Sequence, residues 1–310
     1  MIQNKFDVII PTAGKEAGFV HRVTKYVRDN FLEADTIYIL TNKKYIARIE
    51  ADTKAQDRVC VLDENNIVKG LTIDVVRTLM KKYTEFTSAG WYFQQFLKYG
   101  FSLSNYANKY YLSWDADTIP VSKLSFFDDG KPLFTRKYEY NDNYFATIYK
   151  LLGLNKNAPF SFIAEHMLFS PEIVKELLSK IESSNVQGST WYEKILRAGN
   201  YQHKLPAFSE FETYGTFVTE YYPNLYATRQ LNTFRRGGWI MGRNISDKKL
   251  KALSFDTDTI SFEMRDEPAF PYNIPNRWWR LKDLISKSVQ YKPAIVYKKI
   301  CKLLTGKLKK

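Results

Sequence analysis

Short apolar runs alternate with amphipathic segments over the first part of the chain, and this alternation constrains the fold more than any other feature. Residues 6–11, 36–40 and 58–62 are apolar runs of strand length, and each ends at turn-forming or polar residues. Residues 18–31 and 44–50 lie between them and have the spacing of amphipathic helices. Such alternation is typical of parallel strands covered by helices. We therefore predict an α/β fold with a doubly wound, mostly parallel sheet and helices on both faces.

Turn-forming and polar residues follow each of the three predicted strands. Pro11, Thr12 and Ala13 end the first, Asn42 follows the second and Asp63 follows the third. In open α/β sheets, ligands bind outside the carboxyl ends of the strands. We expect these residues to lie along the edge of the sheet that binds a ligand.

Two carboxylates, Asp115 and Asp117, follow a fourth strand-like run at 109–113, with Ala116 between them. Burying two negative charges costs free energy unless a positive charge neutralises them, and carboxylate oxygens are ligands that hard divalent cations prefer. The pair therefore predicts a divalent-cation site in an enzyme that acts on phosphate-bearing substrates.

A helix is predicted at 90–99, just before the carboxylate strand. Trp91, Gln95 and Lys98 are spaced i, i+4 and i+7, so they share one face of this helix. Gln95 and Lys98 either contact a nucleotide or its phosphates, or they face solvent.

Composition indicates a globular protein. Of 310 residues, 45% are hydrophobic and 25% are charged. No apolar run approaches the ~18 residues that a membrane span requires, and the first seven residues lack the apolar region of a signal peptide. Cys60 and Cys301 are far apart in sequence and are read as free thiols. We expect a cytoplasmic protein.

The net charge of +13 is concentrated in the C-terminal tail. Eleven Lys or Arg and a single acid lie between Arg277 and Lys310, and apolar residues recur among them at roughly helical spacing on either side of Pro293. This pattern favours a basic amphipathic anchor on the anionic inner face of the cell membrane. In the alternative, the apolar side packs on the domain and the lysines form a solvated rim.

Several phosphate-binding signatures are absent. The chain has neither a P-loop nor a Gly-x-Gly-x-x-Gly fingerprint. The Asp-Ala-Asp triplet also fits the phosphatase motif Asp-x-Asp-x-Thr poorly, because Ile119 occupies the fifth position and that motif is normally on a first strand.

The strand ending in Asp115-Ala116-Asp117, preceded by roughly a hundred residues of βα units, resembles the Asp-x-Asp segment of GT-A-fold nucleotide-sugar glycosyltransferases. Residues 90–98, 164–169 and 208–215 are similar to blocks of a bacterial branch associated with lipopolysaccharide or capsular polysaccharide. The resemblance covers about residues 5–245. It implies a GT-A-like catalytic domain at 1–245, with a nucleotide-sugar half to about 120 and an acceptor half at 121–245. A C-terminal extension at 246–310 would carry the basic tail from about 277.

The resemblance implies roles on the donor side. Asp115 and Asp117 would hold Mn²⁺ or Mg²⁺, which bridges to the diphosphate of a nucleotide-sugar, with a UDP-sugar favoured. The strand-end residues named above, together with Ala116, Gln95 and Lys98, would contribute to donor binding. The implied activity is metal-dependent transfer of a sugar, most simply a hexose, to a cell-surface glycan or lipid-linked acceptor.

Three glutamates are candidates for the general base that deprotonates the acceptor hydroxyl. Glu210 and Glu212 are favoured and Glu165 competes with them. The first two would share a face in a strand and diverge in a helix, and they could equally be acids of a helix that starts after Ser209. Retaining stereochemistry would need no such base. His166, beside Glu165 in an apolar run, is either a ligand of the metal or sugar or a core residue.

Residues 232–240 combine Gly237-Gly238 with Arg235, Arg236 and Trp239. A flexible, cationic, aromatic loop of this kind could close over a diphosphate and exclude water, or it could be an exposed turn.

One further function remains open, a non-catalytic nucleic-acid-binding protein that uses its basic tail and aromatic residues. The confinement of the charge to the tail and the absence of a recognition-module signature argue against it. We therefore expect no nucleic-acid partner.

Overall fold

The computed structural model describes residues 5–84, 88–201 and 206–263, together with 266, 268–270, 273–274, 277–278 and 281. The chain divides into two units. Unit 1 consists of Met1–Ala116 and Lys123–Leu231, and unit 2 consists of Asp117–Ser122 and Asn232–Lys310.

The central sheet of unit 1 has five strands in the order β3-β2-β1-β4-β8. The first four are parallel and β8 is antiparallel to β4. All seven residues of β1 are buried, as expected for a central strand with both faces covered. The strands are β1 (Phe6–Thr12), β2 (Ala34–Thr41), β3 (Val59–Asp63), β4 (Tyr111–Trp114) and β8 (His166–Phe169).

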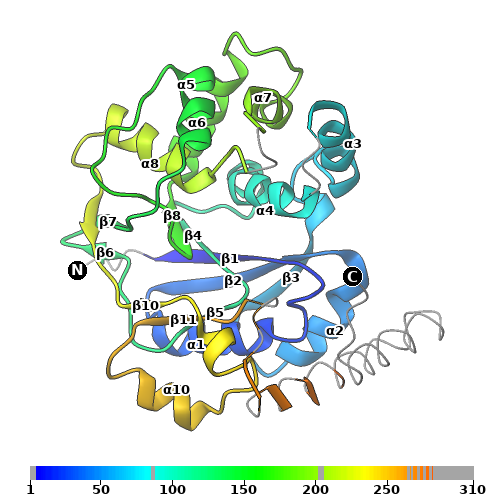
Figure 1. Ribbon diagram of the computed structural model, residues 1–310, viewed down its shortest axis with the longest axis vertical. Coiled ribbons are helices and arrows are strands. Elements are labelled where there is room, and N and C mark those ends of the chain that lie inside the picture. The colour runs from blue at the N-terminus through cyan, green and yellow to red at the C-terminus, as the bar shows by residue number, and fades with distance from the viewer. Residues whose placement is uncertain are drawn as a thin grey trace. The chain divides into compact units, whose positions relative to one another are not determined.

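Helices cover both faces of this sheet. In Figure 1, α1 (Val20–Asn30) and α2 (Lys43–Thr53) lie on one face, and α3 (Ile73–Tyr83) and α4 (Ala89–Gly100) lie on the other. The chain moves outward from β1 to β3 and then returns past β1 to β4, so right-handed crossovers place the two pairs on opposite faces. The predicted α/β fold with a mostly parallel sheet is confirmed.

Unit 1 also contains a small sheet, β6-β7-β9, and a group of helices that packs around aromatic side chains of α4. Phe96 of α4, for example, meets Trp191 edge to face with ring centroids 5.4 Å apart. The remaining elements of this unit are η1 (Glu64–Asn66), η2 (Phe101–Leu103), β6 (Phe127–Asp128), β7 (Lys131–Thr135), α5 (Asp142–Leu152), α6 (Pro171–Glu182), α7 (Trp191–Ala198), α8 (Glu210–Tyr221) and β9 (Ala227–Arg229).

Unit 2 contains a three-stranded sheet in the order β10-β11-β5. The short segment that follows Ala116 joins it as an edge strand antiparallel to β11, and the Phe262 amide donates to the Asp117 carbonyl at 2.8 Å. The elements are β5 (Thr118–Pro120), β10 (Thr233–Phe234), α9 (Gly237–Ile240), α10 (Asp247–Leu253) and β11 (Thr259–Ser261).

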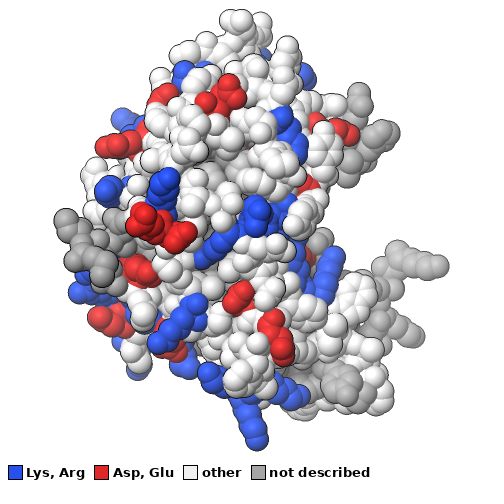
Figure 2. All heavy atoms as spheres, turned by 90° about the vertical axis from the view of Figure 1, so that its left-hand side faces the viewer, with Lys and Arg blue, Asp and Glu red and all other residues white. Residues whose placement is uncertain are grey.

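The basic tail that was predicted as a membrane anchor lies almost wholly outside the described residues, as does Cys301, so these predictions stay predictions. No described helix is long and apolar enough to span a bilayer. On the face shown in Figure 2, Lys and Arg side chains are interspersed with Asp and Glu rather than gathered into a field of one sign.

Candidate functional site

The strand order of the central sheet reverses between β1 and β4. These two strands pair through Ile9 and Ser113, so Pro11, near the end of β1, and Asp115, just after β4, lie side by side at the carboxyl edge of the sheet. Ligands of doubly wound sheets bind at such a switch point, because the chain connections there run to opposite faces and leave the strand ends uncovered. The four polar positions predicted at strand ends, Thr12, Asn42, Asp63 and Asp115, all lie at the carboxyl ends of their strands.

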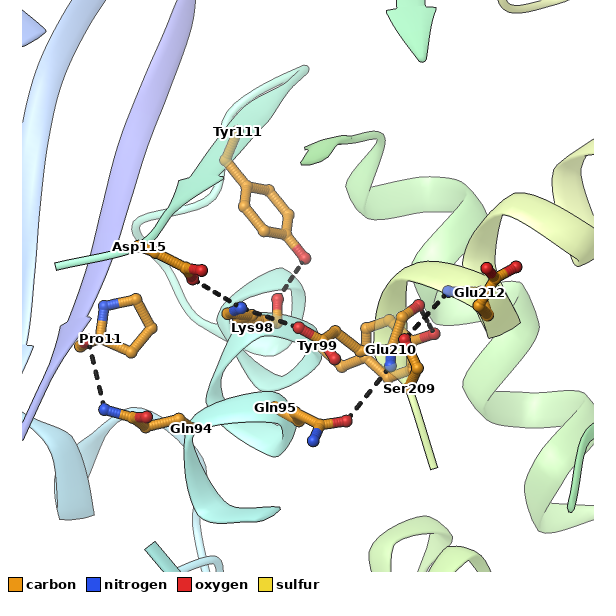
Figure 3. A network of polar contacts seen from close by, with 10 residues as sticks. All are labelled: Pro11, Gln94, Gln95, Lys98, Tyr99, Tyr111, Asp115, Ser209, Glu210 and Glu212. Carbon is orange, nitrogen blue, oxygen red and sulfur yellow. Dashed lines mark hydrogen bonds and ion pairs between the residues drawn. The ribbon is translucent and has the colours of Figure 1, made fainter. Parts of the chain in front are cut away.

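Helix α4 contacts both strands at the switch point (Figure 3). Gln94 Nε2 donates to the carbonyl of Pro11 at 3.4 Å, and one turn later Lys98 Nζ lies 3.1 Å from Asp115 Oδ1. The i, i+4 spacing places both side chains on one face of the helix. Sequence reasoning chose Gln95 and missed Gln94, because two consecutive glutamines give no local signal for which one faces the sheet.

Lys98 forms the electrostatic centre of the site. Its ammonium lies 2.8 Å from Glu210 Oε1 as well as 3.1 Å from Asp115 Oδ1, and its side chain is only 9% exposed. Burial lowers the pKa of Lys98, but the charges of Asp115 and Glu210 outweigh burial and raise the pKa above its ordinary value. The alternative in which Gln95 and Lys98 face solvent is wrong, since both are buried.

The same helix holds the start of α8. Gln95 Oε1 accepts from the Glu210 amide at 3.3 Å, and the Tyr99 hydroxyl donates to the Glu210 carbonyl at 2.6 Å (Figure 3). Tyr111 of β4 in turn donates to the carbonyl of Lys98 at 2.7 Å. These bonds connect β4, α4 and α8 and fix the position of the Glu210 carboxylate.

Glu210 and Glu212 lie in the first turn of α8, where the Ser209 hydroxyl caps the helix by accepting from the Glu212 amide at 3.3 Å. The helical alternative for this segment is therefore correct, and the two carboxylates diverge. Glu210 binds Lys98, whereas Glu212 accepts from the Ser161 hydroxyl and, at 3.2 Å, from the Phe162 amide. Burial raises the pKa of Glu212, and the Ser161 hydrogen bond partly opposes this.

Glu165 lies next to Asp115 across the β4–β8 pair, because its carbonyl accepts from the Asp115 amide at 3.0 Å. Its carboxylate is 3.7 Å from Lys137 Nζ and only 5% exposed. Burial raises the pKa of Glu165, the charge of Lys137 opposes it, and the negative charge of Asp115 adds to the rise. Three acids from three elements therefore lie around the end of β4, with two lysines among them.

His166 packs in the interior beside Glu165. Its ring stacks on Trp114 with centroids 5.0 Å apart, and Nε2 lies 2.9 Å from the Thr135 hydroxyl. Burial, together with the charges of Arg229 and Lys137, lowers the pKa of His166 well below its usual range, so the imidazole is neutral. These contacts are those of a core histidine, and its role towards a ligand stays a prediction.

The polar residues after β2 and β3 bind mainly to the backbone around them. Asn42 caps α2 by accepting from the Lys44 amide at 3.3 Å, and Asp63 accepts from the Asn65 amide at 3.0 Å. The Asn42 amide group also donates to Glu64 Oε1 at 3.4 Å. Glu64, which the sequence did not single out, has a pKa raised to about 7, chiefly by burial.

The residues after β1 are also in part structural. The Thr12 hydroxyl donates to the Ile10 carbonyl at 2.9 Å, and the Thr12 carbonyl accepts from the Thr41 hydroxyl at 3.0 Å. Thr12 is buried and Ala13 is half-buried. If Thr12 and Ala13 contact a ligand, we expect them to do so through their backbone groups at the switch point rather than through their side chains.

Arg235 and Arg236 belong to unit 2, where both are exposed in a turn that leads into α9. Arg236 Nη1 lies 3.3 Å from the buried carboxylate of Asp266. The prediction of a flexible loop is wrong for Gly237 and Gly238, which are buried in α9. A Cβ atom on Gly237 would overlap Ile260, so close packing rather than flexibility explains a glycine there.

The donor set of the predicted metal site fits Mg²⁺ or Mn²⁺ held partly by a substrate. The Asp115 side chain is 39% exposed, and Lys98 engages its Oδ1. Asp117 is two residues further along, so the two Cα atoms are within about 7.6 Å. Among the described residues, no three His, Cys, Asp or Glu side chains are grouped so as to hold a metal ion. Mg²⁺ is usually bound through one or two carboxylates together with phosphate oxygens and water, and two carboxylates are the donors that this prediction supplies.

No protein-family model matches the chain, and no curated protein matches it in sequence. Solved structures similar to it include mouse xyloside xylosyltransferase 1, at 10% identity over 83% of this chain and 97% of that chain, with a TM-score of 0.46. Galactosyltransferase LgtC in complex with donor and acceptor sugar analogues aligns at 10% identity over 83% and 87%, with a TM-score of 0.40. The bifunctional glycosyltransferase WbbM aligns at 12% identity over 96% of this chain and 52% of that chain, with a TM-score of 0.46. TM-scores below 0.5 assign no activity to this chain.

Proposed function

We propose that the chain is a metal-dependent glycosyltransferase that moves a sugar from a nucleotide-sugar, with a UDP-sugar favoured, to a cell-surface glycan or lipid-linked acceptor. The observation that carries this proposal is the group of acids at the switch point of the sheet. Asp115 lies there beside the ends of β1 and β4, bound to the buried Lys98 and adjacent to Glu165. A doubly wound sheet binds ligands at this edge, and carboxylates there suit a cation that carries a diphosphate.

On the donor side, Asp115 and Asp117 would hold Mn²⁺ or Mg²⁺. Such a cation, when bound, offsets the negative charge that develops on the departing nucleoside diphosphate. Lys98 orients the Asp115 carboxylate through an ion pair in which the lysine is buried and the carboxylate is partly exposed. Because this partner is already in place, Asp115 does not have to reorganise when the donor arrives.

On the acceptor side, the contacts favour Glu165 as the general base. Glu210 is bound to Lys98 at 2.8 Å, which neutralises its charge, and Glu212 is occupied by Ser161 and the Phe162 amide. Glu165 has one cation at 3.7 Å and lies next to Asp115, and burial raises its pKa towards the range in which a carboxylate accepts a proton effectively. In an inverting transfer, Glu165 would take the proton of the acceptor hydroxyl as that oxygen attacks the sugar.

The proposal is tested by measuring nucleotide release from a panel of UDP-, GDP- and dTDP-sugars in the presence of Mn²⁺. We expect the wild type to release nucleotide from one donor class. Asp117→Ala should lose at least about a hundredfold in rate, and Glu165→Gln should lose about 10²–10⁴-fold in transfer to an acceptor. Asp57→Ala is the control, because Asp57 is exposed and precedes β3 at the opposite edge of the sheet. Turnover by Asp117→Ala at the wild-type rate would remove the basis of the proposal.

We also propose that the protein is cytoplasmic and binds the inner face of the membrane through its tail from about 277, which brings the active site to a lipid-linked acceptor. This rests on the sequence, in which eleven basic residues are interleaved with apolar ones. Sedimentation with anionic vesicles should require the tail. Equal sedimentation of a chain truncated after Pro275 would exclude this role.

A further inference from the structure

Two tyrosines are strongly exposed in the segment that joins β7 to α5. Tyr138 is 78% exposed and Tyr140 is 61% exposed, and a single residue separates them. Single exposed aromatic residues are common on protein surfaces. Two on one short segment form a small apolar surface, and such a surface can mark a binding site. The described residues of unit 1 offer no other pair of exposed aromatic rings so close in sequence.

The Tyr140 ring is held in a fixed orientation. It stacks on Phe145 of α5 with centroids 5.3 Å apart and an interplanar angle of 20°. Phe145 is buried, and the Lys156 ammonium lies 5.0 Å from the centroid of its ring. One face of Tyr140 therefore rests on the core, and the high exposure of the residue leaves the other face open to a ligand.

The segment is tied to the acidic site by Lys137, the residue before Tyr138. Lys137 and Ser161 exchange two backbone hydrogen bonds of 2.9 and 2.8 Å, and the Ser161 hydroxyl donates to Glu212. The Lys137 ammonium lies 3.7 Å from Glu165 Oε2. Neighbouring Cα atoms are 3.8 Å apart, so Tyr138 begins directly beside the residue that reaches the proposed base. The segment that carries the two rings is therefore joined directly to a residue of the acidic group.

The chemistry of the segment indicates what it binds. Its exposed rings alternate with charged side chains, since Arg136 and Glu139 are also exposed. A pyranose has a face of C–H groups that packs on the electron-rich face of an aromatic ring, and a rim of hydroxyls that hydrogen-bonds to neighbouring polar groups. An acyl chain would require a continuous apolar surface. A protein partner would require roughly 800 Å² on each side, far more than two rings supply.

We propose that Tyr138 and Tyr140 form a platform on which a saccharide unit of the acceptor stacks, with the reacting hydroxyl directed towards Glu165. This assignment rests on the proposed function, because it names the acceptor class of the same site. The platform makes the acceptor a glycan, because stacking on the rings requires the C–H face of a pyranose.

The test compares full-length wild type with Tyr138→Ala, Tyr140→Ala and Tyr138→Phe on an array of defined bacterial-surface oligosaccharides, without any donor. Tyr106→Ala is the matched control. Tyr106 is also an exposed tyrosine stacked on a phenylalanine, Phe101, but it precedes β4 at the opposite edge of the sheet. Binding of UDP and Mn²⁺ is measured on the same proteins by thermal shift.

We expect each alanine variant to lose glycan affinity by about tenfold, which is the upper range for an aromatic contact, while Tyr138→Phe and Tyr106→Ala bind as the wild type does. Nucleotide binding should be unchanged in all of them. Absence of oligosaccharide binding by the wild type, or full binding by both alanine variants, would overturn the platform. Tyrosine-dependent glycan binding by a protein that turns over no nucleotide-sugar would sink the proposed activity and leave the platform in place.

Discussion

At the scale of single residues, the ammonium of Lys98 lies between carboxylates from two different elements, Asp115 after β4 and Glu210 at the start of α8. It is buried, so its removal would leave the buried Glu210 carboxylate and the partly exposed Asp115 carboxylate without their counter-charge. Breaking a buried ion pair by deleting one partner costs more than the pair contributes, because the remaining charge is not compensated.

Lys98→Met should therefore lower the free energy of unfolding by about 3–5 kcal/mol. Adding Glu210→Gln should recover part of this loss, because it removes one of the two uncompensated charges. Urea denaturation of the wild type, both single variants and the double variant measures the coupling. If the two changes were simply additive, the ion pair described here would not contribute to the fold.

Glu64 gives the protein a predictable dependence on pH. Its pKa is raised from 4.5 to about 7, mainly by burial, and the Asn42 hydrogen bond opposes the shift. Between these two values the folded state keeps a proton that the unfolded state has lost, so the contribution of Glu64 to stability falls as pH rises from about 4.5 to about 7.

Glu64→Gln removes this loss. The free energy of unfolding of the variant should equal that of the wild type near pH 4 and exceed it by about 1 kcal/mol at pH 8. This difference is smaller than the full pKa shift would give, because solvent screens a partly exposed carboxyl. Thermal melting at a series of pH values measures the difference. A stability difference that stays constant from pH 4 to pH 8 would show that Glu64 titrates normally.

The sequence predicted some residues of the site well and others poorly. Asp115 was identifiable because it directly follows a buried strand, where a carboxylate favours a positive partner. That Glu210 and Glu212 diverge follows from the start of α8 at Ser209, and the spacing Ser209-x-x-Glu212 is a local signal for such a start. The choice between Gln94 and Gln95 was not predictable, since it depends on how α4 is rotated against a sheet whose strands come from distant parts of the chain.

At the scale of elements, helix α8 packs very closely on the segment that carries Ser161 and Phe162. A Cβ atom added at Gly215, in the middle of the helix, would overlap the ring of Phe162. Glycine costs about 1 kcal/mol of helix stability relative to alanine, so its presence here reflects the close approach and not helix propensity. The approach lets the Glu212 carboxylate reach the Ser161 hydroxyl and the Phe162 amide.

Gly215→Ala should destabilise the protein by about 1–3 kcal/mol, because overpacking outweighs the gain in helix propensity. Gly90→Ala in α4 is the control. No described atom lies within 4 Å of a Cβ added there, so this variant should be as stable as the wild type or more stable. Chemical denaturation of both variants decides the point, and a stabilised Gly215→Ala would contradict the packing described for α8.

The elements themselves were predictable where a local pattern sufficed. The three apolar runs became β1, β2 and β3. Burial on both faces explains the apolar sequence of β1, whereas the edge strand β3 is only partly buried and its apolar residues fit a strand by propensity. The Gly237-Gly238 segment was predicted as a loop because consecutive glycines are typical of flexible segments, but it forms α9. The sequence could not predict that these glycines pack closely against Ile260 and Asp266.

At the scale of the whole molecule, strand order was the step that sequence could not supply. Alternating strands and helices fix the fold class, but the placement of β4 beside β1, and of β8 antiparallel to β4, depends on pairings between residues more than fifty positions apart. Those pairings bring Asp115 beside Pro11 and Glu165. The grouping of the acids in the candidate site therefore depends on strand order. The sequence alone identified the individual acids but not which of them lie together.

The proposed function requires this edge of the sheet to bind a nucleoside diphosphate together with a divalent cation. The most direct measurement is the melting temperature with UDP, with Mn²⁺ and with both, with GDP in parallel. At a nucleotide concentration about 100 times its dissociation constant, binding adds about 2.7 kcal/mol, or about 4 °C for a chain of this size. We expect this rise in melting temperature only when nucleotide and Mn²⁺ are present together, and we expect Asp117→Ala to lose it. The same rise without Mn²⁺, or no rise with either nucleotide, would show that the acids at the end of β4 do not form a metal-dependent nucleotide site.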